Sequence, residues 1–572
     1  MKASAAIPSN PYTHMNASQD CRTPAWRRFQ TGPISTAPRR PDVHLIPNRH
    51  RPLARRLAAR FGLIALAALS LAVTGRAEVQ GWFLPSTIKV LRDAQPLGGM
   101  KEARLAAARN ETESVQLVLR SDEALDGVKV TATALQRGGA PPLLQPSLAK
   151  VEYVPNIVGS TPYPDPLPPL RGLPFRLEAG QAQPIWISVS VPKDTPAGNY
   201  WGDLTVQAGR KRLTFQLNLR VWNFALPDAP ASATAFGLDP DSIARQHGVA
   251  PGSAGARDLY TAYYQALLDR RISAYNLPVD LMSDEAARYL NDPRLTSYVI
   301  PYSEDDVAMT RLATRLVERG WFRKGIYYPI DEPFKKEAYD QLNRIGERLK
   351  KVAPGYQWVV PFYRGPDWQT TQTAFDLLAG QANIWCPNLQ YFDTEKRTRP
   401  FLADRRQLGD RTWWYVCCGP GAPYNNFFVE MPALAHRLLF WQQKRENVGG
   451  LLYWNTTWWN PASTTDPWAD MATVKDINPK IHGDGSLFYP GKAVGIDGPV
   501  TSIRLEVIRD GLEDFDYLTL ADRVLGRDET LALVKRVAPS LQEYTADPVD
   551  FELVRRVIGE KLSAKLHKLK ER

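Results

Sequence analysis

Two adjacent carboxylic acids, Asp331 and Glu332, are the residues in this sequence best placed to do chemistry. They follow an apolar run over residues 325–330 and precede a helix-period segment over residues 334–352. Paired carboxylates can act as general acid and general base, so we interpret them as the catalytic centre. The structural alternative is a helix start, because an acid followed by Pro333 is also typical of an N-cap and first turn. The rest of the chain has to decide between the two.

The elements that would present this pair alternate between strand-like and helix-like segments from residue 229 to residue 526, which predicts a (β/α)8 TIM barrel as the catalytic domain. The candidate strands are residues 233–238, 272–276, 297–301, 325–330, 357–362, 382–386, 412–416 and 449–454. Amphipathic helices are predicted over residues 254–271, 305–319, 335–352, 371–380 and 431–446. The second of them has a capping-box-like start at Ser303 and Asp306. In such a barrel the reacting groups stand where the strands end.

Polar and aromatic residues stand at most of these predicted strand ends. Besides the carboxylate pair, the candidates for substrate binding are Asn276, Tyr363, Asn388, Tyr391, Tyr415, Trp454, Asn455 and Trp459. Amide and phenol groups can hydrogen-bond hydroxyl groups, and indole rings can stack on the faces of sugars. The set therefore predicts a carbohydrate site in preference to a phosphate or metal site.

The region before the barrel, residues 78–228, alternates apolar and polar residues, most clearly over residues 185–191 and 213–221. This period predicts half-buried strands, arranged with intervening turns as an antiparallel β-sandwich. Residues 155–174 contain seven prolines, which exclude a central strand or a helix there. The simpler interpretation of that stretch is an extended surface connection, and the alternative is a rigid arm that leans across the neighbouring site.

Helices are predicted to end the chain, a closing helix over residues 500–525 and a helical extension over residues 527–572. Charged residues crowd the closing helix and favour ion pairs: Arg504, Glu506, Arg509, Asp510, Glu513 and Asp514. Gly511 among them suggests close helix packing. The predicted fold class is thus multidomain β plus α/β, an N-terminal antiparallel β-sandwich followed by a (β/α)8 barrel with C-terminal helices.

The formal charge of +11 comes almost entirely from a leader, residues 1–77, which holds 12 of the 71 Lys and Arg residues but 2 of the 60 Asp and Glu residues. The nearly neutral remainder offers no basic surface for nucleic acid. Arginines precede the apolar run 61–73, and a small-x-small site follows at residues 75–77, which is typical of a secretory signal peptide. We therefore expect export to the periplasm or medium, without a stable membrane span in the mature chain.

Cysteine and histidine usage predicts neither a disulfide framework nor a metal site. After the leader the chain has Cys386, Cys417 and Cys418, an odd number whose vicinal pair rarely forms a bridge. The histidines outside the leader are scattered without the spacing of zinc ligands. We expect no metal and no cofactor.

Several motifs together resemble a known family. Asp331-Glu332 at the predicted fourth strand end, preceded by a β-sandwich and the Tyr-Pro-Asp-Pro-Leu run at residues 163–167, resembles glycoside hydrolase family 123. Residues 451–460, 466–468, 483–491, 502–506 and 509–514 are similar to the related domain of unknown function 4091. The likeness covers most of the chain after the leader.

This resemblance implies a retaining β-N-acetylhexosaminidase, typically a β-N-acetylgalactosaminidase, that uses substrate-assisted catalysis. Asp331 would orient the acetamido nitrogen, and Glu332 would act as general acid and then general base. A tyrosine commonly completes the acetamido pocket in such enzymes, with Tyr391 and Tyr415 as the candidates here. The alternatives are a glycosidase for a sugar without an acetamido group and a non-catalytic glycan-binding protein.

Overall fold

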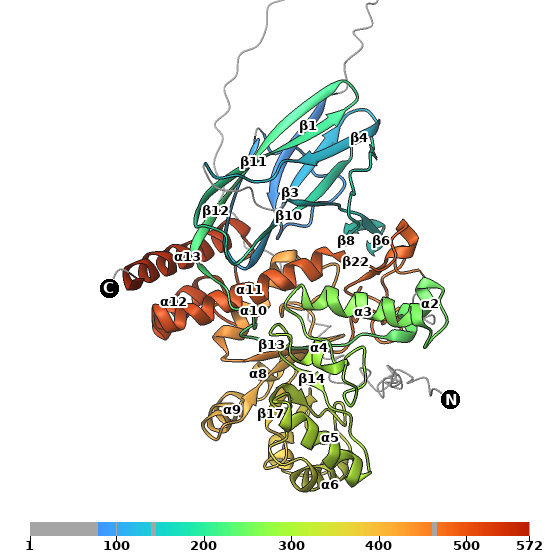
Figure 1. Cartoon of the computed structure of the whole chain (residues 1–572), viewed down its shortest axis with the longest axis vertical. Helices are drawn as coiled ribbons and strands as arrows, with labels where there is room; N and C mark the ends of the chain where they lie inside the picture. The colour runs from blue at the N-terminus through green and yellow to red at the C-terminus, as the bar shows by residue number, and fades with distance from the viewer. Residues whose placement is uncertain (1–77, 99, 139–144, 460–465, 571–572) are drawn as a thin grey trace, which may run out of the picture.

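The computed structural model describes residues 78–98, 100–138, 145–459 and 466–570. The predicted leader and its signal peptide lie outside the described residues, so export stays a prediction. Figure 1 shows the N-terminal sheets on one side of α10 (Ala433–Arg445) and α11 (Ile503–Val524), with the parallel strands and their helices on the other. No helix in the described ranges is both long and apolar enough to cross a membrane.

Two sheets form the N-terminal region. The first has the order β1 (Val79–Pro85), β3 (Glu111–Ser121), β10 (Ala182–Val191) and β5 (Ser147–Lys150), with every pair antiparallel. The second has the order β2 (Glu102–Arg109), β12 (Lys211–Ala225), β11 (Gly198–Ala208), β4 (Leu125–Ala132) and β9 (Phe175–Leu177). Its β2–β12 pair is parallel, so the prediction of a wholly antiparallel arrangement is wrong at that pair.

A shared core joins the two sheets. Leu117 and Ile185 from the first sheet and Leu204 and Phe215 from the second belong to one buried cluster. The alternating residues of β10 and β12 point into it, as the period-2 pattern predicts. Trp186 faces the other way and is also buried, because it packs against a second cluster that includes residues of α11. The first sheet is therefore covered on both faces there.

The proline-rich stretch is not a surface connection. It forms the hairpin of β6 (Tyr153–Val158) with β7 (Thr161–Pro164), and then β8 (Pro166–Leu167) pairs with β22 (Pro499–Ser502). Between β7 and β8, Asp165 is fully buried and accepts a hydrogen bond from Arg504 of α11 at 2.8 Å and from the hydroxyl of Tyr489 at 2.7 Å. The stretch thus ties the N-terminal sheets to the C-terminal part of the chain.

Short parallel strands follow these sheets. They are β13 (Ala233–Phe236), β14 (Tyr298–Val299), β15 (Gly325–Ile326), β16 (Val359–Phe362), β17 (Ile384–Pro387), β18 (Arg411–Thr412), β19 (Trp414–Val416) and β20 (Gly450–Tyr453). They are grouped into three parallel sheets with the orders β13–β20–β19, β14–β15 and β16–β17–β18. The predicted strand at residues 272–276 is reduced to one bridge between Ala274 and Phe236.

Helices connect the parallel strands. Those that coincide with predicted helices are α3 (Ala254–Leu268), α5 (Asp306–Glu318), α6 (Lys336–Val352), α7 (Ala374–Leu378) and α10. Shorter ones are α2 (Pro240–His247), α4 (Ala286–Leu290), α8 (Tyr391–Thr394) and α9 (Thr398–Gln407), with the 3-10 turns η1 (Phe322–Lys324) and η2 (Gly491–Val494). The N-cap of α5 is Asp305, which accepts from two backbone N–H groups, so the capping start predicted at Ser303 is wrong.

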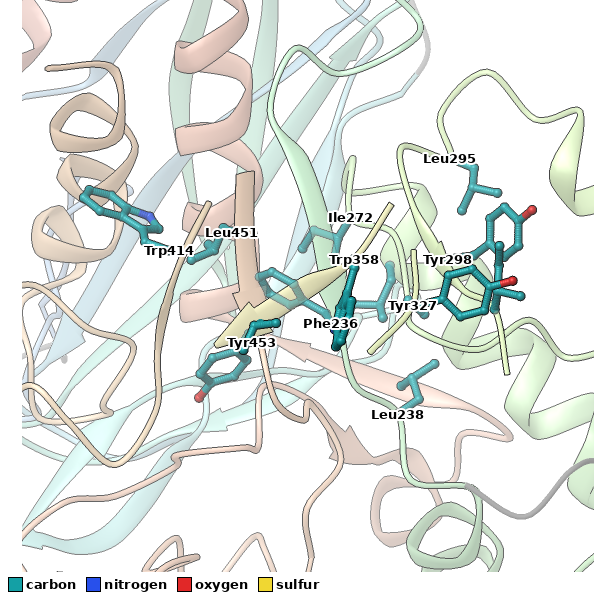
Figure 2. Close-up of a cluster of buried hydrophobic side chains, with 14 of the residues drawn as sticks. Phe236, Leu238, Ile272, Leu295, Tyr298, Tyr327, Trp358, Trp414, Leu451 and Tyr453 are labelled. Carbon is teal, nitrogen blue, oxygen red and sulfur yellow. The ribbon is translucent and has the colours of Figure 1, made fainter. Parts of the chain in front are cut away.

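Alternation along the parallel strands divides their side chains between two buried clusters. Figure 2 shows the larger one, where Tyr298, Tyr327, Trp358 and Trp414 lie among aliphatic side chains. Residues of the opposite parity form a separate cluster: Tyr275, Val299, Ile326, Tyr328, Val359, Ile384, Cys386, Trp413, Tyr415 and Leu452. Since neighbouring residues of a strand point to opposite sides, this second cluster lies on the face away from the helices.

The C-terminal helices are α11, α12 (Arg527–Val537) and α13 (Pro548–Lys570), with the short strand β21 (Tyr489–Pro490) before them. Charged side chains of α11 are buried and paired, as predicted. Asp514 binds the Nε atoms of Arg437 on α10 and Arg555 on α13, both at 2.7 Å. Arg555 also pairs with Glu111 and Glu113 of β3, so one junction joins the N-terminal sheets to three helices.

Gly511 lies where α11 crosses α10. A Cβ atom at this position would stand 2.2 Å from Cδ2 of Phe440 on α10, which is far inside van der Waals contact. The sequence-based expectation of close helix packing at Gly511 is confirmed. The close approach brings Asp514, one turn further along α11, within reach of Arg437.

Removing the central carboxylate of this junction should destabilise the protein. Burial opposes the charge of Asp514, but Arg437 and Arg555 hold the pKa of its carboxyl below the ordinary value. We expect Asp514→Ala to remove the carboxylate that bridges two buried guanidinium groups and to lower stability by about 3–5 kcal/mol, measured as a lower melting temperature. The control is Asp340→Ala, which breaks the exposed pair with Lys336. Equal melting temperatures for the two variants would contradict the importance of the junction.

Candidate active site

Asp331 and Glu332 lie between β15 and α6, and both are half-buried. Helix α6 begins at Lys336 with Lys335 as its N-cap, and that cap makes no side-chain hydrogen bond. Neither acid therefore caps the helix, which removes the structural alternative for the pair. Glu332 has a φ of 41°, a left-handed backbone conformation that is uncommon for residues other than glycine. Such conformations persist only where the surroundings enforce them, and they cluster at functional sites.

Each acid accepts a hydrogen bond from a different tyrosine. The hydroxyl of Tyr328 donates to Oδ1 of Asp331 at 2.6 Å. The hydroxyl of Tyr415, on β19, makes a short hydrogen bond to Oε1 of Glu332. Both tyrosines belong to the second cluster described above, on the face of the parallel strands away from the helices, which we call the inner cluster. The two carboxyls are thus fixed separately, one by a tyrosine three residues before it and one by a strand more than eighty residues later.

Burial sets the protonation of this group. It raises the pKa of Asp331 to about 6, although the hydrogen bonds from Tyr328 and from the backbone N–H of Glu332 oppose the rise. Burial, and then the charge of Glu332, raises the pKa of Tyr415 well above its usual value, so its phenol stays a hydrogen-bond donor. Burial and the charge of Asp331 do the same to the thiol of Cys386. The carboxyl of Asp331 can therefore exchange a proton near neutral pH.

Two more of the predicted residues, Tyr363 and Trp454, stay partly exposed near the ends of their strands. Tyr363 is half-buried and packs against the inner cluster that contains Tyr415. Arg364 follows it with its guanidinium 4.3 Å from the ring of Phe334, two residues beyond Glu332. Trp454 directly follows β20 and keeps part of its indole exposed. Its side chain packs against the larger buried cluster and against a small cluster that contains Phe428 and Met431.

Other predicted binding residues have structural roles instead. Trp459 is fully buried, and its indole N–H donates to Ser486 at 2.9 Å, so neither face of its ring is free to stack on a sugar. Asn455 is buried and its side chain accepts from the backbone N–H groups of Thr456 and Thr457. The prediction that Trp459 and Asn455 bind substrate is wrong for these reasons.

The remaining candidates are also used by the fold. Tyr391 packs edge-on against the rings of Phe362 and Phe375 in the larger cluster of Figure 2. Of the two candidate tyrosines, Tyr415 is therefore the one that contacts the carboxylate pair. The amide of Asn388 is buried and donates to the carbonyl of Gly419 at 3.3 Å. Asn276 is half-buried, and its backbone carbonyl accepts from the hydroxyl of Tyr260, so its side chain is not engaged by that contact.

Sequence reasoning missed two residues at this end of the strands. Tyr328 lies inside the apolar run before the pair. The one feature of the sequence that could have pointed to it is its spacing of two residues from Ile326, which places both side chains on the same face of an extended chain. Asp484 is buried in the loop after β20 and receives the indole N–H of Trp454, 3.2 Å from each of its carboxylate oxygens. Burial raises the pKa of Asp484 to about 7. Its signal was the Gly-Asp-Gly motif at residues 483–485.

The indole of Trp454 is held on three sides. Asp484 binds its N–H group, and the ring of Trp458 contacts it edge-on with centroids 5.2 Å apart. A Cβ atom on Gly485 would stand 2.2 Å from Cζ2 of the indole, so only glycine leaves the ring this position. Trp454 is therefore a fixed aromatic surface at the end of β20. In the described part of the chain, no group of three or more His, Cys, Asp or Glu side chains could hold a metal ion.

Models of known protein families match this sequence over both of its parts. A model of the glycoside hydrolase 123 catalytic domain matches residues 306–521, and a model of the glycoside hydrolase 123 N-terminal domain matches residues 92–208. The protein is a glycoside hydrolase. Since the two models together match more than half of its length, the chain belongs to the glycoside hydrolase 123 family, as the sequence motifs implied. A search of curated proteins found no match.

Among solved structures, a family 123 glycoside hydrolase from Clostridium perfringens, studied for glycolipid glycan hydrolysis, is similar with a TM-score of 0.64 at 13% identity. The alignment covers 86% of this chain and 98% of that one, and at this identity it shows the fold alone. Two β-glucuronidases, from Parabacteroides merdae and Bacteroides uniformis, reach TM-scores of only 0.27 and 0.26, at 11% and 8% identity. Their alignments cover 78% and 72% of this chain and 51% and 50% of the glucuronidase chains.

Displacing the indole of Trp454 should weaken substrate binding. We expect Gly485→Ala to push the ring aside and to raise KM for an aryl glycoside by about 2- to 10-fold through lost stacking, with a shift in tryptophan fluorescence. Gly495→Ala is the matched control, since Gly495 has a φ of 69° against 68° for Gly485 and no atom within 4 Å of its Cβ position. If both variants change KM equally, backbone strain and not the indole explains the effect.

Proposed function

We propose that this protein is a retaining β-N-acetylhexosaminidase, similar to a β-N-acetylgalactosaminidase, that acts by substrate-assisted catalysis. The observation that carries the proposal is the pair of adjacent acids, Asp331 and Glu332, each fixed by its own tyrosine hydroxyl. Glycosidases whose protein supplies the nucleophile hold two carboxyls on opposite sides of the anomeric carbon. Adjacent residues of one loop more naturally approach the sugar from one side, which leaves the attack to a group of the substrate.

The roles follow from the resemblance to the family and from the hydrogen bonds. Glu332, as a carboxylic acid, gives its proton to the glycosidic oxygen while the carbonyl oxygen of the 2-acetamido group attacks the anomeric carbon. The bond to the leaving group breaks and an oxazolinium ion forms. Asp331, as a carboxylate, accepts the acetamido N–H and stabilises the developing positive charge.

The second half of the reaction restores the enzyme. The carboxylate of Glu332 takes a proton from a water molecule, whose oxygen attacks the anomeric carbon from the side the leaving group left. The bond between the anomeric carbon and the acetamido oxygen breaks, and the sugar is released with its original configuration. Tyr415 keeps its proton throughout, because burial raises its pKa, and so it can steady Glu332 in both of its states.

We further propose that the parallel strands close into a (β/α)8 barrel over residues 229–526. Backbone hydrogen bonds support links between the three parallel sheets: Phe236 N–H to Ser273 at 3.0 Å, Val299 N–H to Tyr275 at 2.8 Å, Tyr327 N–H to Gln357 at 2.7 Å and Leu389 N–H to Tyr415 at 3.1 Å. The inner cluster also draws residues from every predicted strand position. In such a barrel Asp331 and Glu332 would stand at the functional face.

Replacing the two acids tests the proposed chemistry. We expect Glu332→Gln to lower kcat on aryl 2-acetamido-β-glycosides by about 10²- to 10⁴-fold, because the general acid is lost. Asp331→Asn should lower it comparably under substrate assistance. Glu337→Gln, in the first turn of α6, is the control. Release from glycosides without the acetamido group, or glycan binding without release, would contradict the proposal.

The acid limb of the pH profile tests the state of Asp331. Its carboxyl has a raised pKa of about 6, so the reactive carboxylate is lost as the pH falls through about 6. We expect kcat/KM to fall on the acid side with that midpoint. Tyr328→Phe removes a hydrogen bond that holds this pKa down, so the midpoint should move to higher pH. Tyr302→Phe, at an exposed contact with Glu304, should leave it unchanged. An unmoved midpoint in Tyr328→Phe would assign the limb to another group.

A further inference from the structure

A cavity of about 670 Å³ lies at the opposite end of the parallel strands from the carboxylate pair. Its walls come from residues that precede or begin the strands, among them Ala233 of β13, Lys324 before β15 and Gly449 before β20. Asp331 and Glu332 follow β15, so the length of that strand separates them from Lys324. The cavity is therefore distinct from the candidate active site.

The charges that line this cavity are mostly positive. Lys324, Arg406, Arg411 and Lys444 contribute four cations, and Asp410 is the acid among the lining residues. Asp410 is already engaged, since its Oδ2 atom accepts from Nε of Arg405 at 2.6 Å and from the indole N–H of Trp385 at 2.7 Å. It cannot neutralise the four cations as well.

Two of the cations have partners of their own. Lys444 pairs with Asp522 at 2.6 Å. Lys324 donates to the carbonyl of Asp292 at 3.0 Å. Both lysine ammonium groups thus have an acceptor from the protein. The cations that remain for a ligand are the guanidinium groups of Arg406 and Arg411.

The guanidinium groups of Arg406 and Arg411 have fewer acceptors from the protein. Arg406 donates to the hydroxyl of Thr412 at 3.0 Å, which is a neutral acceptor. The guanidinium of Arg411 lies 5.7 Å from the ring of Trp413, and its Nη2 atom is buried without an acceptor among the described residues. Burial lowers the pKa of Arg411 to about 10. Burial and the nearby Arg527 lower the pKa of the half-buried Arg406, and the charge of Glu446 opposes them, so Arg411 is the cation left without a counter-charge. A buried cation without a counter-charge is costly, and an anion would remove that cost.

We propose that this cavity binds an oxyanion, the sulfate or phosphate group of a small molecule, between Arg406 and Arg411. The planar guanidinium group offers paired N–H donors that match the oxygens of such a group. The volume of the cavity exceeds that of a free ion and falls in the range of small-molecule sites, so the group can arrive as a free ion or as an ester on a sugar.

Thermal unfolding of the full chain tests the proposal without any assay of catalysis, so the outcome is independent of the proposed function. Melting temperatures are measured with sodium sulfate, with sodium phosphate and with sodium chloride at equal ionic strength. We expect sulfate or phosphate to raise the melting temperature of the wild type by at least about 2 °C more than chloride, in a saturable way. Arg411→Gln should lose this increment, and Arg411→Lys should keep part of it.

The general stabilising effect of sulfate on proteins is removed by a matched control. Arg319→Gln changes an exposed arginine at the end of α5 and should keep the full increment. N-acetylgalactosamine 6-sulfate, compared with the unsulfated sugar, distinguishes an ester from a free ion. The proposal is overturned if Arg411→Gln and Arg319→Gln show the same increment, or if calorimetric titration of the wild type with sulfate shows no binding.

Discussion

The buried ion pairs around α11 hold this molecule together. Asp514 joins Arg437 and Arg555, and Arg555 reaches across to Glu111 and Glu113 in the N-terminal sheet. Each of these charges would be costly in the interior without its partner, so the loss of one destabilises the others. It explains why α11, unlike an ordinary amphipathic helix, is buried on nearly every side. The N-terminal sheets serve as a support for the catalytic part of the chain.

A second buried ion pair, between Arg504 and Asp165, connects the N-terminal region with the loop after β20. Arg504 binds Asp165 of the proline-rich stretch, and it also donates to the carbonyls of Gly483 and Ser486. These two residues bracket Asp484 and Gly485, which fix the indole of Trp454. A single guanidinium group thus connects the N-terminal region, the closing helix and the loop that holds the indole of Trp454. The proline-rich stretch is thus tied to the loop that carries Asp484 and Gly485 through Arg504.

Local patterns in the sequence were sufficient to predict most of the elements. Alternation located β10 and β12 of the N-terminal sheets, and the order of apolar run, acids and helix located Asp331 and Glu332. Contacts between distant segments could not be predicted in the same way. Tyr328 looked like core, and the role of Asp484 depends on Trp454, thirty residues earlier. Trp459 and Asn455 were placed at the site because they follow a strand, but packing against later residues turned them inward. The segment at residues 272–276 is apolar enough for a strand, yet its neighbours allow it a single bridge.

The partners of the N-terminal acids come late in the chain, and this orders events during synthesis. Asp165 meets Arg504 more than three hundred residues later, and Glu111 meets Arg555 more than four hundred residues later. While the ribosome is still making the catalytic part, the early sheets carry these acids without their arginines. The nascent sheets can pack around their own core, but Asp165 finds its arginine only after α11 has been made, and Glu111 only after α13 has been made.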